Sequence, residues 1–230
     1  MKKTDLRLER EHWRRQEYRQ SILKAAEKIV AQKGYSAMTM DDVAREAEFS
    51  KATLYHYFKG KGELILQIIE SFFDEIRKGL AKVRRLRVSA RERLKRGIYF
   101  YLQFNQKKEN ISRVLMMDKS FIEKLRIFVT EENKLTSEID RRFINSIKAK
   151  RREILADVAQ ILREGVENKE FRPMDIQATI IFFEAVLQGY YHVKLWHERH
   201  YSLDEAAELI YSFFLHGIER KEGRTKGVSR

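Results

Sequence analysis

Apolar residues recur along most of this chain at the spacing of an amphipathic α-helix, and no stretch stands out with the alternating period of a β-strand. In the first helical segment, five apolar positions follow one stripe of a helix: Ile22, Ala25, Ala26, Ile29 and Val30. They predict a helix from about residue 20 to residue 33. Gly34 ends it, because glycine readily adopts the left-handed backbone that commonly follows a helix.

Two shorter helices are predicted directly afterwards, each with its own start signal. Thr39 and Asp42 form a variant of the capping box, in which a hydroxyl and a carboxylate satisfy the first free backbone amides. Ser50 can cap the next helix, where Leu54 and Phe58 stand four residues apart and form a buried pair. Two short helices joined by the residues AEFS have the proportions of a helix-turn-helix.

Longer amphipathic segments follow, and they predict helices at about 63–80, 90–106, 110–130, 135–168, 176–196 and 203–217. Asp175, just beyond the chain's one proline, can cap the fifth of these. The predicted fold class is therefore all-α, with a three-helix N-terminal domain and a larger C-terminal helical domain. The predicted boundaries are a basic N-terminal arm at 1–19, the helix-turn-helix domain at 20–66, the larger domain at 67–218 and a polar tail at 219–230.

Composition limits the functions open to such a chain. The 230 residues include 47 Lys and Arg against 34 Asp and Glu, a formal net charge of +13. This excess favours a polyanionic partner, although a solubilising surface rich in Lys, Arg and Glu gives the same composition. Cysteine is absent, which excludes disulfides and thiolate metal sites, and the N-terminus lacks the apolar core of a signal peptide. We therefore expect a cytoplasmic protein without membrane segments.

The helix that follows Ser50 carries the chemistry expected of a recognition helix. If Leu54 and Phe58 face the core, a step of 100° per residue turns four side chains outward: Ala52, Thr53, Tyr55 and His56. Lys51 and Tyr57 then lie at the flanks, where an ammonium or a phenol can reach DNA phosphates. Phenol and imidazole groups also donate to base edges, and a methyl group suits contact with thymine. The alternative is that the two tyrosines cover the core and the histidine is solvated.

The segment GYSAMTMDDVAREAEFSKATLYHYFKGKGEL closely resembles the DNA-binding segment of TetR-family transcriptional regulators. The shared pattern is a Gly-Tyr after the first helix, a Thr before the second, and a Leu-Tyr-x-x-Phe recognition helix followed by Lys-x-x-Leu. The match covers residues 20–66 approximately. It implies a dimer of two-domain subunits that binds palindromic operator DNA and releases it when a small molecule binds. Matched residue by residue, the DNA-facing positions are Thr39, Ser50, Lys51, Ala52, Thr53, Tyr55, His56, Tyr57 and Lys61.

Two positions depart from this family pattern. Glu48 stands in the turn where the family usually has Gly, at a place that often needs a left-handed backbone. We therefore expect a strain of about 1 kcal/mol or a turn of different shape. Gly62 replaces a more usual acidic or polar residue near the start of the fourth helix, which can weaken that helix end. Neither change removes a DNA contact.

The two C-terminal helices, at about 176–196 and 203–218, are too apolar for a solvated surface. A second subunit would cover them in a four-helix bundle, and the resemblance implies the same homodimer. The first of these helices carries a polar row, formed by Glu184, Gln188 and His192. This row could line an effector pocket, hydrogen-bond across the dimer or face water. Including that row, the predicted contacts of a small hydrophobic effector are Tyr99, Tyr101, Phe104, Met117, Phe121, Phe183, Glu184, Gln188 and His192.

A cluster of ten basic residues against one acid, Glu92, lies between Arg77 and Arg96. These cations repel one another unless an anion, or acids elsewhere in the chain, offset their charge. Our hypothesis is an effector with an apolar body and an anionic head, such as a fatty acyl thioester of coenzyme A. A solvated or DNA-facing basic surface is the alternative.

No cofactor, catalytic residue or metal site is predicted. The sequence contains no glycine-rich phosphate loop, nucleophile elbow or paired metal-ligand motif. The three histidines His192, His197 and His200 also lack the i, i+4 spacing of a helical ligand pair. The predicted function is a ligand-responsive repressor rather than an enzyme. The alternative is an architectural DNA-binding protein without effector, which would bind all duplexes alike instead of one palindrome.

Overall fold

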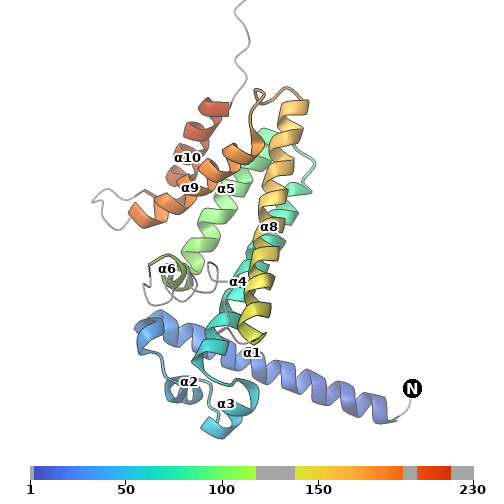
Figure 1. Ribbon diagram of the computed structural model, residues 1–230, viewed down its shortest axis with the longest axis vertical. Coiled ribbons are helices and arrows are strands. Elements are labelled where there is room, and N and C mark those ends of the chain that lie inside the picture. Colours follow the sequence, from blue (N-terminus) through green and yellow to red (C-terminus); the bar gives the residue numbers. More distant parts are fainter. Residues whose placement is uncertain (1–2, 118–137, 194–200, 219–230) are drawn as a thin grey trace, which may run out of the picture. The chain divides into compact units, whose positions relative to one another are not determined.

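The computed structural model describes residues 3–117, 138–193 and 201–218, with the backbone alone at 3–7, 116–117, 138–140, 192 and 218 (Figure 1). The predicted all-α fold class is confirmed in these ranges. The helices are α1 (Lys3–Ala37), α2 (Met40–Glu46), α3 (Lys51–Tyr57), α4 (Lys61–Arg84), α5 (Ala90–Lys107), α6 (Glu109–Met117), α8 (Glu138–Glu167), α9 (Ile176–Val193) and α10 (Leu203–Ile218). Most of the helix predicted at 110–130 and the polar tail lie outside the described residues.

The chain divides into two compact units that combine segments distant in the sequence, whereas the predicted domains are consecutive stretches of it. We call Met1–Asp74 with Lys108–Lys148 the recognition unit, and Glu75–Lys107 with Ala149–Arg230 the cavity unit. Helices α4 and α8 each contribute residues to both units. In the recognition unit α6 packs on α1, and the Lys108 ammonium lies 2.8 Å from the Glu27 carboxylate. Such long-range pairing is not visible in the helical periodicity of either segment.

Helix α1 supplies the core of the recognition unit with its second half. The predicted stripe is buried there, with Ile22 and Ala26 fully inaccessible, and Gly34 has the expected positive φ of 77°. The predicted start near residue 20 is wrong, because α1 begins at Lys3. Residues 3–19 contain neither Gly nor Pro, and extending a helix from a folded nucleus costs little free energy.

The cavity unit is built from parts of α4 and α8 together with α5, α9 and α10. Its apolar core includes the fully buried side chains of Ile98, Leu102, Leu162 and Phe171. Gly165 on α8 admits the Phe171 ring, because a Cβ atom at that position would stand 2.1 Å from the ring. The predicted cap of α9 is confirmed, since the Asp175 carboxylate accepts from the backbone amides of Gln177 and Ala178.

None of the described helices combines the length and the apolarity needed to cross a lipid bilayer.

Candidate DNA-binding surface and effector cavity

The start of α2 is fastened by the capping box that the sequence predicts. The Asp42 amide donates to the Thr39 hydroxyl at 3.1 Å, and the Thr39 amide donates to the Asp42 carboxylate at 3.2 Å. The Lys33 ammonium also lies 2.7 Å from this carboxylate. These hydrogen bonds, first that of Lys33 and then that of Thr39, lower the pKa of Asp42 to about 2. The side chain of Thr39 is exposed at the edge of the helix-turn-helix, and these hydrogen bonds fix its orientation.

The turn between α2 and α3 contains the strained position that the sequence indicates. Glu48 has a φ of 58°, a left-handed conformation that costs a residue with a Cβ atom about 1 kcal/mol. The neighbouring Phe49 amide donates to the Ala44 carbonyl at 3.0 Å and closes the end of α2. The turn therefore keeps the usual shape despite its glutamate.

Helix α3 presents one face to solvent and one to the core. Its predicted core pair is buried, with Leu54 at 0% and Phe58 at 1% exposure. The Ser50 hydroxyl accepts from the Thr53 amide at 3.0 Å, which confirms the predicted cap. The predicted contact residues all have accessible side chains: Lys51, Ala52, Tyr55 and His56 are exposed, and Thr53 and Tyr57 are partly exposed.

Two of these contact residues also make structural contacts. The Lys51 ammonium lies 2.8 Å from the Asp41 carboxylate of α2, so its charge is partly offset. The Tyr57 ring packs edge-on against Tyr18 of α1, with the ring centroids 6.3 Å apart. Tyr55 is 48% exposed and remains the more accessible phenol. The alternative was that both tyrosines cover the core. Tyr57 is partly covered by its contact with Tyr18, whereas Tyr55 remains accessible.

Lys61 has a structural role that the sequence did not reveal. Its ammonium donates to three backbone carbonyls at the end of α1 and just beyond it, those of Tyr35, Ser36 and Met38, at 3.0–3.3 Å. It also lies 4.9 Å from the centroid of the Tyr35 ring. A cation at the carboxyl end of a helix satisfies carbonyls that have no partner in the helix. In this conformation Lys61 fastens α4 to α1, and contact with a phosphate would compete with these bonds.

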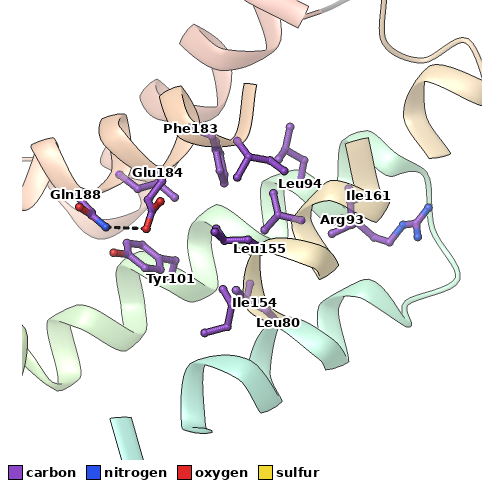
Figure 2. A pocket seen from close by; sticks show the side chains of 14 residues that line it. Leu80, Arg93, Leu94, Tyr101, Ile154, Leu155, Ile161, Phe183, Glu184 and Gln188 are labelled. Carbon is purple, nitrogen blue, oxygen red and sulfur yellow. Dashed lines mark hydrogen bonds between the residues drawn. The ribbon is translucent and has the colours of Figure 1, made fainter. Parts of the chain in front are cut away.

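The cavity unit contains an apolar cavity of about 80 Å³ (Figure 2). Four helices contribute to its wall: α4, α5, α8 and α9. The lining residues are Leu80, Arg93, Leu94, Gly97, Tyr101, Ile154, Leu155, Val158, Ile161, Ile180, Phe183, Glu184, Leu187 and Gln188. Such a volume holds a few water molecules, so a larger ligand needs side chains to move apart.

Polar groups lie at both ends of the cavity. Figure 2 shows Tyr101, Glu184 and Gln188 close together at one end, with Arg93 at the other. Gln188 donates to the Glu184 carboxylate at 3.0 Å, and the Arg151 guanidinium contacts both oxygens of that carboxylate. Burial, and then the nearby Glu184 charge, raise the pKa of Tyr101 to about 12. Its hydroxyl therefore stays protonated at neutral pH and is able to donate to a ligand.

The basic cluster at Arg77–Arg96 is largely offset by acids from distant parts of the cavity unit. Arg93 lies 2.6 Å from Glu164 of α8, and this guanidinium is the main reason that the pKa of Glu164 is lowered. Three further pairs join Arg77 to Glu153, Arg84 to Asp157 and Lys95 to Glu208. Within the described part of the chain, Lys78, Lys82, Arg85 and Arg87 form no ion pair.

The structure brings four of the nine predicted effector contacts together in the cavity: Tyr101, Phe183, Glu184 and Gln188. Tyr99 is 37% exposed and Phe104 stacks on Phe100, and neither lines the cavity. Phe121 and the side chains of Met117 and His192 lie outside the described structure, as do His197 and His200. The aliphatic cavity residues of α8 could not be picked out from the sequence, because their helical spacing is the same as that of any core-facing stripe.

Comparison with known proteins agrees with this architecture. Residues 22–68 match the family model described as "Bacterial regulatory proteins, tetR family". The chain is 25% identical over 185 residues to YhgD of Bacillus subtilis (strain 168), described as an uncharacterized HTH-type transcriptional regulator. That match covers 80% of this chain and 86% of YhgD.

Solved structures have the same fold. A TetR/AcrR-family transcriptional regulator from Thermobifida fusca has a TM-score of 0.63 at 23% identity, covering 88% of this chain and 98% of that one. The regulator FadR of Bacillus subtilis, solved with stearoyl-CoA, has a TM-score of 0.67 at 18% identity, covering 87% and 99%. Together with the capped helix-turn-helix and its exposed α3, the family match shows that residues 22–68 are a DNA-binding segment of the TetR family of bacterial regulatory proteins.

Proposed function

We propose that this protein is a dimeric repressor that binds a palindromic operator through α3 and leaves it when a hydrophobic effector enters the cavity. The observation that carries the proposal is the exposed face of α3 on a buried Leu54–Phe58 pair. Helix α4 supports the coupling, because it continues from the recognition unit to Leu80 in the cavity wall. A ligand that displaces Leu80 therefore acts on a helix that also belongs to the DNA-binding unit.

Selection of bound fragments from a random duplex library tests the DNA-binding part. A repressor enriches one palindrome whose half-sites lie about one helical turn apart or slightly more. Equal binding to all duplexes would instead identify the architectural alternative. On the selected operator, substitutions at Ala52 or Thr53 are expected to change base preference, because both side chains lie on the accessible side of α3.

The dimer is supported by an apolar surface on α9 and α10. Ile181 and Phe182 of α9 are 65% and 68% exposed, and Leu209 and Phe213 of α10 are 53% and 71% exposed. Large apolar side chains that are exposed on two neighbouring helices are of the kind that marks protein interfaces. A second copy of the chain covers this surface in our proposal, because two such helix pairs make a four-helix bundle.

Sedimentation at micromolar concentration tests the dimer. The variant Phe182→Asp/Phe213→Asp is expected to sediment as a monomer and to lose operator affinity. Leu8→Asp is the matched control for sedimentation alone, since Leu8 is 60% exposed on α1, outside this apolar surface. A wild-type monomer would contradict the proposal.

The effector in our proposal has an apolar body that enters the cavity, because aliphatic and aromatic groups dominate its wall. An acyl thioester of coenzyme A is our first candidate, and the fold shared with a regulator solved with stearoyl-CoA is consistent with it. Arg84 is paired with Asp157, so among the described cations without an ion pair we propose Arg85 and Arg87, in the connection after α4, as the contacts of an anionic head.

Operator release and thermal stabilisation are to be compared for stearoyl-CoA, stearate and a hydrophobic cation. Leu155→Trp is expected to fill the cavity and abolish release while the operator affinity stays unchanged. Tyr99→Trp on α5 is the control, because Tyr99 does not line the cavity. Arg85→Gln/Arg87→Gln is expected to weaken release by stearoyl-CoA selectively. Release by the cation alone would reject the anionic head.

A further inference from the structure

The first half of α1 extends beyond the folded part of the recognition unit. Every described side chain from Leu8 to Tyr18 is exposed, including Trp13 at 76%. Much of the second half of the same helix is buried, so the exposed first half continues from a stable nucleus. A projecting helix of this kind is available to a partner.

The projecting segment begins beside the recognition helix. Tyr18 packs on Phe49 of the turn, with ring centroids 5.0 Å apart, and on Tyr57 at the end of α3. The Arg19 guanidinium donates to the Tyr57 carbonyl at 3.2 Å. The side of α1 that carries Tyr18 therefore faces the helix-turn-helix. The projecting segment is continuous with the DNA-binding surface.

Two cations continue this side of the helix outward. Arg14 and Arg15 stand four and three residues before Tyr18, so they lie on the same side of α1 one turn further out. Both are exposed, and neither forms an ion pair within the described structure. One acid, Glu11, lies on this side a further turn out, but cations outnumber acids among residues 3–19.

We infer that this projecting segment, through Arg14 and Arg15, binds the sugar–phosphate backbone of the DNA that flanks the half-site read by α3. The inference rests on the proposed operator binding. Phosphates complement unpaired guanidinium groups, and they lie next to any duplex that α3 enters. From Tyr18 back to Lys3 the helix spans roughly 22 Å at 1.5 Å per residue, the length of about six base pairs. The bound site is therefore longer than the palindrome contacted by α3.

The test compares the selected operator with short flanks of about two base pairs and with long flanks of about ten, beyond the reach of the helix. The full-length wild type is expected to bind the long duplex more tightly and with a steeper salt dependence. Arg14→Gln/Arg15→Gln is expected to lower the slope of log K against log salt by about 1.8 on the long duplex, since each lost phosphate contact removes about 0.9. On the short duplex the double variant is expected to have the same affinity and salt slope as the wild type.

Lys24→Gln is the matched control, because Lys24 is an exposed cation on a different side of α1 within the folded unit. This substitution is expected to change the affinity and the salt slope for neither duplex. Equal wild-type affinity and salt slope on both duplexes would overturn the inference, as would a double variant that weakens both duplexes to the same extent. If the wild type does not prefer the operator to an unrelated duplex, the proposed function fails instead.

Discussion

The helix-turn-helix of the recognition unit pairs several of its charges with residues close in the sequence, whereas the basic cluster of the cavity unit pairs mostly with residues far away. Lys33 and Asp42 are nine residues apart, and Lys51 and Asp41 are ten apart. In the cavity unit, Arg77 donates to Glu153 across 76 residues. The difference shows that a basic stretch in a sequence does not identify a surface for polyanions. A basic stretch is available to a polyanion only where the folded chain places no acidic side chains beside it.

The largest expected effect comes from breaking a long-range pair. Arg93→Met leaves Glu164 without its main partner, and the side chain of Arg93 is 10% exposed. We expect the free energy of unfolding to fall by about 2 kcal/mol, less than for a fully buried pair because Glu164 is partly solvated. Denaturation in urea measures the change.

Arg96→Met provides the control for this prediction. Arg96 pairs with Glu92 one turn away on the same helix, and both side chains are about half exposed. Its loss is expected to cost at most about 0.5 kcal/mol. If both variants lose the same stability, distance in the sequence has no bearing on what a pair contributes.

The next effect sharpens the comparison at two described residues with a left-handed backbone, one in each unit. Glu48 and Lys169 have φ values of 58° and 62°. Replacing either by Gly is expected to raise the free energy of unfolding by about 1 kcal/mol, because glycine adopts this conformation without steric cost. Equilibrium denaturation checks it. Arg45→Gly, within the regular part of α2, should instead lower stability by about the same amount.

The smallest effect concerns the pH dependence of the capping box. The folded pKa of Asp42 is about 2, below the ordinary value of 3.8, so its stabilising effect is present above pH 4. It is lost as the pH falls from about 4 to 2, because the unfolded state takes up the proton first. Asp42→Asn is expected to remove this part of the acid dependence. An unchanged acid profile in that variant would show that the box does not stabilise α2.

Much of the recognition unit could be predicted because its determinants are local. Thr39 with Asp42, Ser50 with the Thr53 amide, and Leu54 with Phe58 act within four residues, and each was found where expected. The left-handed turn at Glu48 was likewise indicated by the family pattern. The start of α1 was not predicted. Nothing in its polar first half requires burial, so no apolar stripe marks it, and no residue there breaks a helix.

Local patterns in the sequence were enough to predict most of the described helices, their caps, the exposed face of α3 and the apolar character of α9 and α10, since periodicity and capping depend on neighbours along the chain. The tertiary structure alone decided which aliphatic side chains enclose the cavity. It also decided that Lys61 fastens α4 to α1, and that acids of α8 and α10 offset much of the basic cluster. These contacts join segments far apart in the sequence, so their energies depend on packing that no local pattern encodes.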